Sequence, residues 1–174
     1  SWAFHNWMSL SRGAPYTSFV EIDHENVIPD GELCSAGNDR YDVHNLPGEW
    51  PVTHLEPGPS GAHELTYNAT APHLTEYYRV YLTGPDFDAR TDELTWDDLT
   101  LATEWQPDGP EDDRPSEVNF EVELPDREDP AIIYVIWHRS ENEEAFYSCS
   151  DVTISGGFAE LDGASTGSAS STAF

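Results

Sequence analysis

Short runs of alternating apolar and polar residues, separated by Pro, Gly, Asn and Asp, recur along this chain. Runs of this kind, rich in β-branched and aromatic residues, are typical of strands that have one buried face. No long segment has the helical period. The predicted strands are residues 63–70, 77–83, 118–125, 131–139 and 150–156. We therefore expect an all-β fold, and the spacing of the strands suits a two-sheet sandwich.

The remaining segments differ from this pattern in informative ways. Residues 131–139 are almost continuously apolar, which predicts a central strand covered on both faces. Residues 94–100 suggest a short helix or turn, and residues 106–115 an acidic loop. Beyond residue 157 the sequence becomes rich in Gly, Ser, Ala and Thr. We expect one folded domain over 1–157 and a flexible tail or clipped linker over 158–174.

Charge narrows the range of partners. The chain has 34 acidic residues against 7 Lys and Arg, with a formal net charge of −27, and none of the seven is Lys. Such a surface repels phosphate groups, so nucleic acids and anionic membranes are poor partners. The aromatic content of 12% argues against disorder. Molar salt screens repulsion of this kind, so we expect a protein adapted to salt, with a generic acidic secreted protein as the alternative.

The two cysteines, Cys34 and Cys149, lie in different predicted elements. A disulfide between them would close a long loop and would fit an extracellular protein. Two free buried thiols are the alternative. No stretch approaches the ~20 apolar residues needed to cross a bilayer. We therefore expect a secreted, monomeric protein from which any signal peptide has already been removed.

Four segments together suggest a family. They read IPDGELCSAGN (28–38), WPVTHL (50–55), ATAPHLTEYYRVYLT (69–83) and WHRSENEEAFYSCSDV (137–152). In this order they resemble the lytic polysaccharide monooxygenases of auxiliary activity family ten, also called the chitin-binding type-4 domain. The resemblance extends over about residues 7–157. It implies an immunoglobulin-like or fibronectin-III-like sandwich with short helical or irregular insertions, and a flat face that binds crystalline chitin or cellulose.

The resemblance also implies a copper site. In the family a histidine brace holds the ion through the amine and imidazole of an N-terminal histidine and the imidazole of a second histidine. His73 falls on the second position, Ala71 on a small residue beside the axial side of the copper, and Phe146 on the axial aromatic. Glu144 matches an acidic position that handles the oxygen species. Three nitrogen ligands suit Cu(II).

Without the resemblance these residues have simpler interpretations. A histidine after Ala-Pro is more often a turn residue than a ligand, Phe146 would belong to the core, and Glu144 would be one of many surface acids. Glu144 and Phe146 are two positions apart, so on one strand they share a face. His54 and His138 have no support from the resemblance and are expected to be structural or exposed. Trp50 and Trp137 are expected to anchor the core.

The chain departs from the family at its start, because it does not begin with histidine. Its first residues, SWAFHNW, resemble a stretch well inside the family's domain. Three explanations are open: an N-terminal truncation, a shortened relative that binds without oxidising, or substitution by His5 as the second copper ligand. One imidazole alone cannot hold copper tightly.

Three functions follow from these observations. The first is copper-dependent oxidative cleavage of an insoluble polysaccharide, chitin or cellulose, if the full N-terminus is present. The second is a non-catalytic carbohydrate-binding module. The third is a structural or adhesive surface protein that uses the same sandwich.

Overall fold

Strands account for most of the fold in the computed structural model, which describes residues 8–10, 21–108, 114–125 and 127–155. None of the helices in this part of the chain is long and apolar enough to cross a membrane. The strands are β1 (Met8–Leu10), β2 (Thr53–Leu55), β3 (Ala62–Asn68), β4 (Thr75–Thr83), β5 (Leu99–Trp105), β6 (Glu117–Glu123), β7 (Arg127–Arg139) and β8 (Ala145–Ile154). The helices are α1 (His24–Val27) and the 3₁₀ turns η1 (Leu33–Ser35), η2 (Asp39–Asn45) and η3 (Trp96–Asp98).

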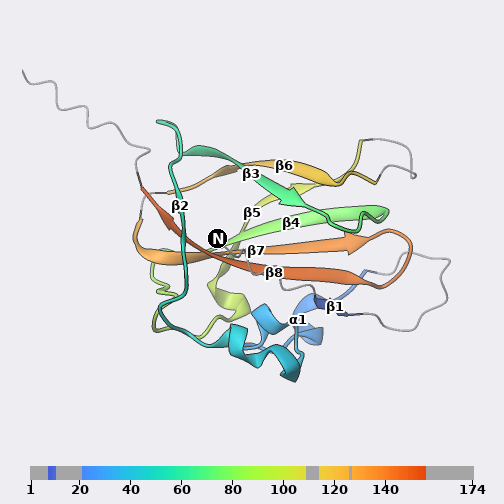
Figure 1. Cartoon of the computed structure of the whole chain (residues 1–174), viewed down its shortest axis with the longest axis horizontal. Helices are drawn as coiled ribbons and strands as arrows, with labels where there is room; N and C mark the ends of the chain where they lie inside the picture. The colour runs from blue at the N-terminus through green and yellow to red at the C-terminus, as the bar shows by residue number, and fades with distance from the viewer. Residues whose placement is uncertain (1–7, 11–20, 109–113, 126, 156–174) are drawn as a thin grey trace, which may run out of the picture.

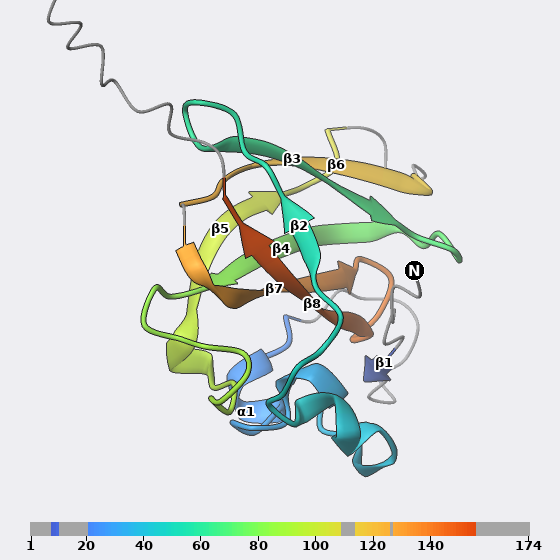
Figure 2. The ribbon, with the colours of Figure 1, turned by 60° about the vertical axis from the view of Figure 1, so that its left-hand side comes forward.

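Two sheets form the sandwich. The larger sheet has the order β1-β8-β7-β4-β5, with β2 also paired to β8, and the smaller one consists of β3 and β6. All pairs are antiparallel except β2 with β8. In Figure 1 the smaller sheet covers one face of the larger sheet, and α1 with its neighbouring turns covers the other face. Figure 2 shows β2 beside β8. The expected all-β sandwich is confirmed.

The central strand β7 explains why residues 131–139 are nearly all apolar. Every residue from 131 to 138 is buried, because both faces of the strand are covered. Tyr134 and Ile136 belong to the core under the helical segment. Val135 and Trp137 belong to the core shared with the smaller sheet. Alternate side chains of one strand therefore supply two separate cores.

A disulfide fastens the helical segment to the larger sheet. Cys34 in η1 and Cys149 in β8 are bonded, with their Cα atoms 5.4 Å apart and a sequence separation of 115 residues. The expected pairing is confirmed, and neither cysteine of the chain is a free thiol. Closing so long a loop removes much conformational freedom from the unfolded chain.

The strand predictions were correct for β3, β4, β6 and β7, and incomplete elsewhere. Strand β8 begins at Ala145, five positions before the predicted start. The window 94–100 contains the predicted short turn, η3, but strand β5 follows it at once and was missed. Strand β5 lies at the edge of its sheet and is largely exposed, so its sequence lacks a clear alternation.

The prediction that Trp50 anchors the core was wrong. It is only half-buried and belongs to neither core. Its ring instead lies 6.3 Å from that of His44, and its indole N–H donates to the carbonyl of Leu46 at 2.8 Å. Part of the predicted acidic loop 106–115 and the whole predicted tail 158–174 lie outside the described residues, so the domain boundary stays a prediction.

Candidate functional site around His73

His73 lies in the loop between β3 and β4, two residues before β4 begins. The Thr75 hydroxyl donates to the carbonyl of His73 at 3.3 Å and accepts the indole N–H of Trp137 at 2.8 Å. One residue along, the backbone N–H of Ser140 donates to the carbonyl of Leu74 at 3.1 Å. The buried Trp137 and the end of β7 therefore fix the position of His73 at this edge of the sandwich.

Three rings pack together at this edge. The His73 ring lies 5.7 Å from the Phe146 ring with an angle of 6° between their planes, and 5.7 Å from the Trp137 ring. Trp137 and Phe146 are directly opposite each other on β7 and β8, with their ring centroids 4.7 Å apart. His73 is half-buried, and its ring nitrogens make no hydrogen bond within the part of the chain that the structure describes. Its nitrogens are therefore available to a ligand.

Ion pairs lie beside the rings. The guanidinium of Arg139 donates to the carboxylates of both Glu144 and Glu141. Arg114 adds a further contact to Glu141 at 3.1 Å. The side chains of Arg139 and Glu144 are only 15% and 16% exposed, so their pairing is better shielded from water than an ordinary surface pair. The turn between β7 and β8 thus holds Glu144 in one place.

Partial burial and nearby charges together favour the neutral form of the His73 imidazole. Partial burial lowers the pKa of His73, and the positive charge of Arg139 lowers it further, against opposing effects of Glu144 and Glu141. Burial by itself would lower the pKa of Arg139, but its hydrogen bonds to Glu141 and Glu144 outweigh this and raise it. A neutral imidazole has the lone pair that a metal ion requires.

The other predicted residues lie in different settings. Ala71 is exposed in the same loop, two residues before His73. His5 lies outside the described residues. His54 is exposed at β2, and His138 is fully buried on β7. Across the described ranges, no group of three His, Cys, Asp or Glu side chains is arranged to hold a metal ion.

Sequence reasoning missed Arg139 and Glu141. The signal was present, because Arg139 ends a predicted strand and the next six residues, SENEEA, carry three acids through a turn. Opposite charges that flank a hairpin turn face each other across the strands. The backbone N–H of Arg139 indeed donates to the carbonyl of Glu144 at 3.1 Å.

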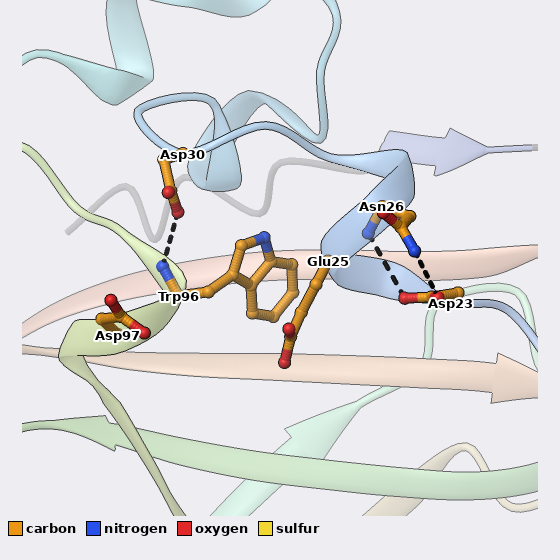
Figure 3. Close-up of a pocket in the computed structure, with 6 residues that line it drawn as sticks. All are labelled: Asp23, Glu25, Asn26, Asp30, Trp96 and Asp97. Carbon is orange, nitrogen blue, oxygen red and sulfur yellow. Dashed lines mark hydrogen bonds between the residues drawn. The ribbon is translucent and has the colours of Figure 1, made fainter.

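A separate acidic hollow lies on the helical side of the sheet. Figure 3 shows Glu25 and Asp97 on either side of Trp96, with Asp30 accepting a hydrogen bond from the Trp96 backbone. The Trp96 indole N–H is already used by the carbonyl of Ile28, at 2.8 Å. His73 does not line this hollow.

Comparison with known proteins identifies the family. The family model described as "Lytic polysaccharide mono-oxygenase, cellulose-degrading" matches residues 1–152. The chain belongs to the lytic polysaccharide monooxygenases of auxiliary activity family ten. The resemblance seen in the sequence is therefore confirmed, and enzymes of this family depend on copper.

Individual monooxygenase-family relatives agree with this assignment. The chain is 32% identical to the chitin-binding protein CbpD of Pseudomonas aeruginosa, over 90% of this chain and 39% of that protein. It superimposes on a lytic polysaccharide monooxygenase important for efficient utilization of chitin in Cellvibrio japonicus, with a TM-score of 0.67 and 35% identity, over 79% of this chain and 74% of that chain. For the cellulose-active lytic polysaccharide monooxygenase CelS2, solved in complex with copper, the TM-score is 0.62 and the identity 32%, over 82% and 74% of the two chains. This chain spans less than half the length of CbpD.

Proposed function

We propose that this protein is a copper-dependent monooxygenase that cleaves an insoluble polysaccharide, chitin or cellulose, and that His73 is a copper ligand. One observation carries the proposal. In a chain of this family, the half-buried His73 imidazole is stacked against Phe146, its nitrogens are not occupied by other described residues, and burial lowers its pKa.

The described residues supply part of the set of ligands that a copper ion needs. A half-buried imidazole beside an aromatic ring suits a copper ion that must stay open to solvent and substrate. The described residues bring one imidazole to this place, and the brace needs a second histidine together with its amine. The proposal therefore requires a further histidine near His73, either His5 or an N-terminal histidine of the mature protein.

Each residue of the site has a proposed task. Copper, when bound, would supply one-electron chemistry with oxygen or peroxide for oxidation next to the glycosidic bond. His73 provides a nitrogen ligand. Phe146 covers one side of the site and keeps water away from it. Glu144 holds or accepts a proton at its carboxylate, and Arg139 fixes that carboxylate. Ala71, exposed in the same loop, would leave room beside the metal ion.

The disulfide, the proposed substrate and the net charge indicate where the protein works. A disulfide between Cys34 and Cys149 is stable in an oxidising environment, and insoluble polysaccharides lie outside cells. We therefore propose that the protein is secreted. The net charge of −27 and the absence of lysine support a further part of the proposal, that it works at high salt. Its melting temperature should then rise steeply from low to molar salt, whereas a flat response would contradict the salt adaptation.

A non-catalytic carbohydrate-binding module is the second candidate function. The relative CbpD is named a chitin-binding protein, and the described residues offer a single imidazole at the site. A module of this kind would bind chitin or cellulose and leave it intact.

Product analysis separates the two functions. The mature protein is incubated with chitin or cellulose, copper and ascorbate, and soluble products are identified by mass spectrometry. The monooxygenase releases oxidised oligosaccharides only when ascorbate is present, and His73→Ala releases none. The matched control His54→Ala changes an exposed histidine far from the site and keeps full activity. Binding to the solid without oxidised products would favour the module.

A further inference from the structure

A buried hydrogen-bonded chain on the helical side of the sheet plays no part in the proposed chemistry. His24, only 7% exposed, lies at its centre. Its Nε2 is 2.8 Å from the hydroxyl of Tyr77, and its Nδ1 is 2.7 Å from the hydroxyl of Tyr147. The Tyr77 hydroxyl in turn donates to the carboxylate of Glu21 at 3.1 Å.

Counting protons fixes the direction of this chain. An ionised carboxylate only accepts hydrogen bonds, so the single hydroxyl hydrogen of Tyr77 is directed to Glu21. The oxygen of Tyr77 must then accept its other bond from the Nε2–H of His24. A neutral imidazole carries one hydrogen, so Nδ1 is bare and accepts the hydroxyl of Tyr147. Each hydrogen has one acceptor, in the order Tyr147, His24, Tyr77, Glu21.

The hydrogen-bonded chain joins the strands that carry the His73 site. Tyr77 is on β4, the strand that begins directly after the His73 loop, and Tyr147 follows Phe146 on β8. Because β7 lies between β4 and β8, His24 connects two strands that are not hydrogen-bonded to each other. The chain therefore ties α1 to both flanks of the central strand.

Protons can reach His24 from solvent. His24 lines a hollow of about 400 Å³, whose wall also includes the acidic side chains Glu21, Asp23 and Glu25. Carboxylates at such an opening attract protons as the solution becomes acidic. A proton that reached His24 would add a second N–H at Nδ1, so the Tyr147 hydroxyl could no longer donate to this nitrogen and would have to turn its hydrogen away.

Two basic residues near His24 oppose a positive imidazole. From β7 the His138 ring lies 5.9 Å away, and from β4 the Arg79 guanidinium lies 4.0 Å above the ring of Tyr77. On its own element, Asp23 acts in the opposite sense. Burial, His138 and Arg79 together lower the pKa of His24 to about 3.

We propose that Tyr147, His24, Tyr77 and Glu21 form an acid-sensitive latch that holds α1 against β4 and β8 while His24 is neutral and releases it when His24 is protonated. The latch does not depend on the proposed copper chemistry.

The tautomer gives the first test. Nitrogen-15 NMR of the histidine-labelled 174-residue chain in molar salt should show one imidazole that is protonated at Nε2 and bare at Nδ1. That signal should stay unchanged from pH 7.5 to pH 5 and be absent in His24→Gln. The opposite tautomer, or an imidazole of His24 that titrates near its ordinary pKa of about 6.5, would overturn the latch.

The proton taken up on unfolding gives the second test. Unfolded His24 has an ordinary pKa and folded His24 a lowered one, so unfolding takes up one proton as the pH falls below about 6.5. The free energy of unfolding, measured in urea between pH 7.5 and pH 4.5, should depend less steeply on pH in His24→Gln than in the parent. The difference in slope should correspond to one proton. Glu21→Gln keeps an acceptor for Tyr77, and His54→Gln changes an exposed histidine, so both should behave like the parent. If the pH dependence of the unfolding free energy is unchanged in His24→Gln, or is reduced in Glu21→Gln instead, the latch is contradicted.

If His24→Gln does not fold, the variant Tyr147→Phe tests the latch instead. This variant removes the hydroxyl that Nδ1 accepts, so the bare nitrogen should take up a proton more readily. The histidine NMR signal should then titrate at a higher pH than in the parent. Identical titration in parent and variant would show that Tyr147 does not hold His24 neutral.

Discussion

His24 and His73 lie on opposite sides of the same sheet, and the two differ in how their ring nitrogens are used. Partial or full burial lowers the pKa of both. His24 is almost fully buried, with each ring nitrogen within hydrogen-bond distance of a tyrosine hydroxyl. His73 is half-buried, and the rest of the described chain offers its nitrogens no hydrogen bond.

This difference separates a structural histidine from a candidate ligand. A histidine whose two nitrogens are already bonded contributes to folding and has no lone pair to offer. A neutral histidine with unused nitrogens at an edge can bind a metal ion or a substrate. The helical side, with its disulfide and buried chain, supports the sheet, whereas the edge around His73 leaves chemistry accessible.

The disulfide should give the largest effect, on the helical side. Replacing Cys34 and Cys149 together by Ala should lower the free energy of unfolding by about 4 to 5 kcal/mol, because the bond closes a loop of 115 residues. Urea unfolding in molar salt measures this. A loss below ~1 kcal/mol would show that the helical side does not depend on the bond.

Alanine at the two histidines tests the comparison itself. His24→Ala leaves a cavity and removes the hydrogen bonds of His24 to the Tyr77 and Tyr147 hydroxyls, so we expect it to lower the free energy of unfolding by about 2 to 4 kcal/mol. For the half-buried His73, the same change should cost less than ~1 kcal/mol. Equal losses in the two variants would remove the distinction between a structural and a ligand histidine.

The ion pairs beside His73 should give a smaller effect. Arg139→Gln leaves the carboxylates of Glu144 and Glu141 without their shared cation, so we expect a loss of about 1 to 2 kcal/mol. The double variant Arg139→Gln with Glu144→Gln should recover part of this loss, since one unpaired charge is then removed. If the two losses simply add, the pair does not hold Glu144 in place.

Much of the fold could be predicted because burial leaves a pattern in the sequence. Strand β6 alternates fully between exposed and buried residues, and residues 131–138 of β7 are all buried, so both strands were recognised. Strand β5 was missed because an exposed edge strand needs no alternation. The helices α1 and η1 have 4 and 3 residues, too few for a helical period to appear.

The candidate site could be predicted only through the resemblance. Nothing in the local sequence places His73 beside Phe146, because they are brought together by strands far apart in the chain. The roles of Arg139 and Glu141 depend on a turn whose geometry the sequence does not specify. The buried chain around His24 was missed for the same reason, since its members come from α1, β4 and β8 and the segment before α1.

Copper binding to the mature protein tests the central claim most directly. Calorimetric titration with Cu(II) should show tight one-to-one binding for the mature protein and for the control His54→Ala, and loss of that binding in His73→Ala. Tight one-to-one binding that survives His73→Ala would show that His73 is not the ligand.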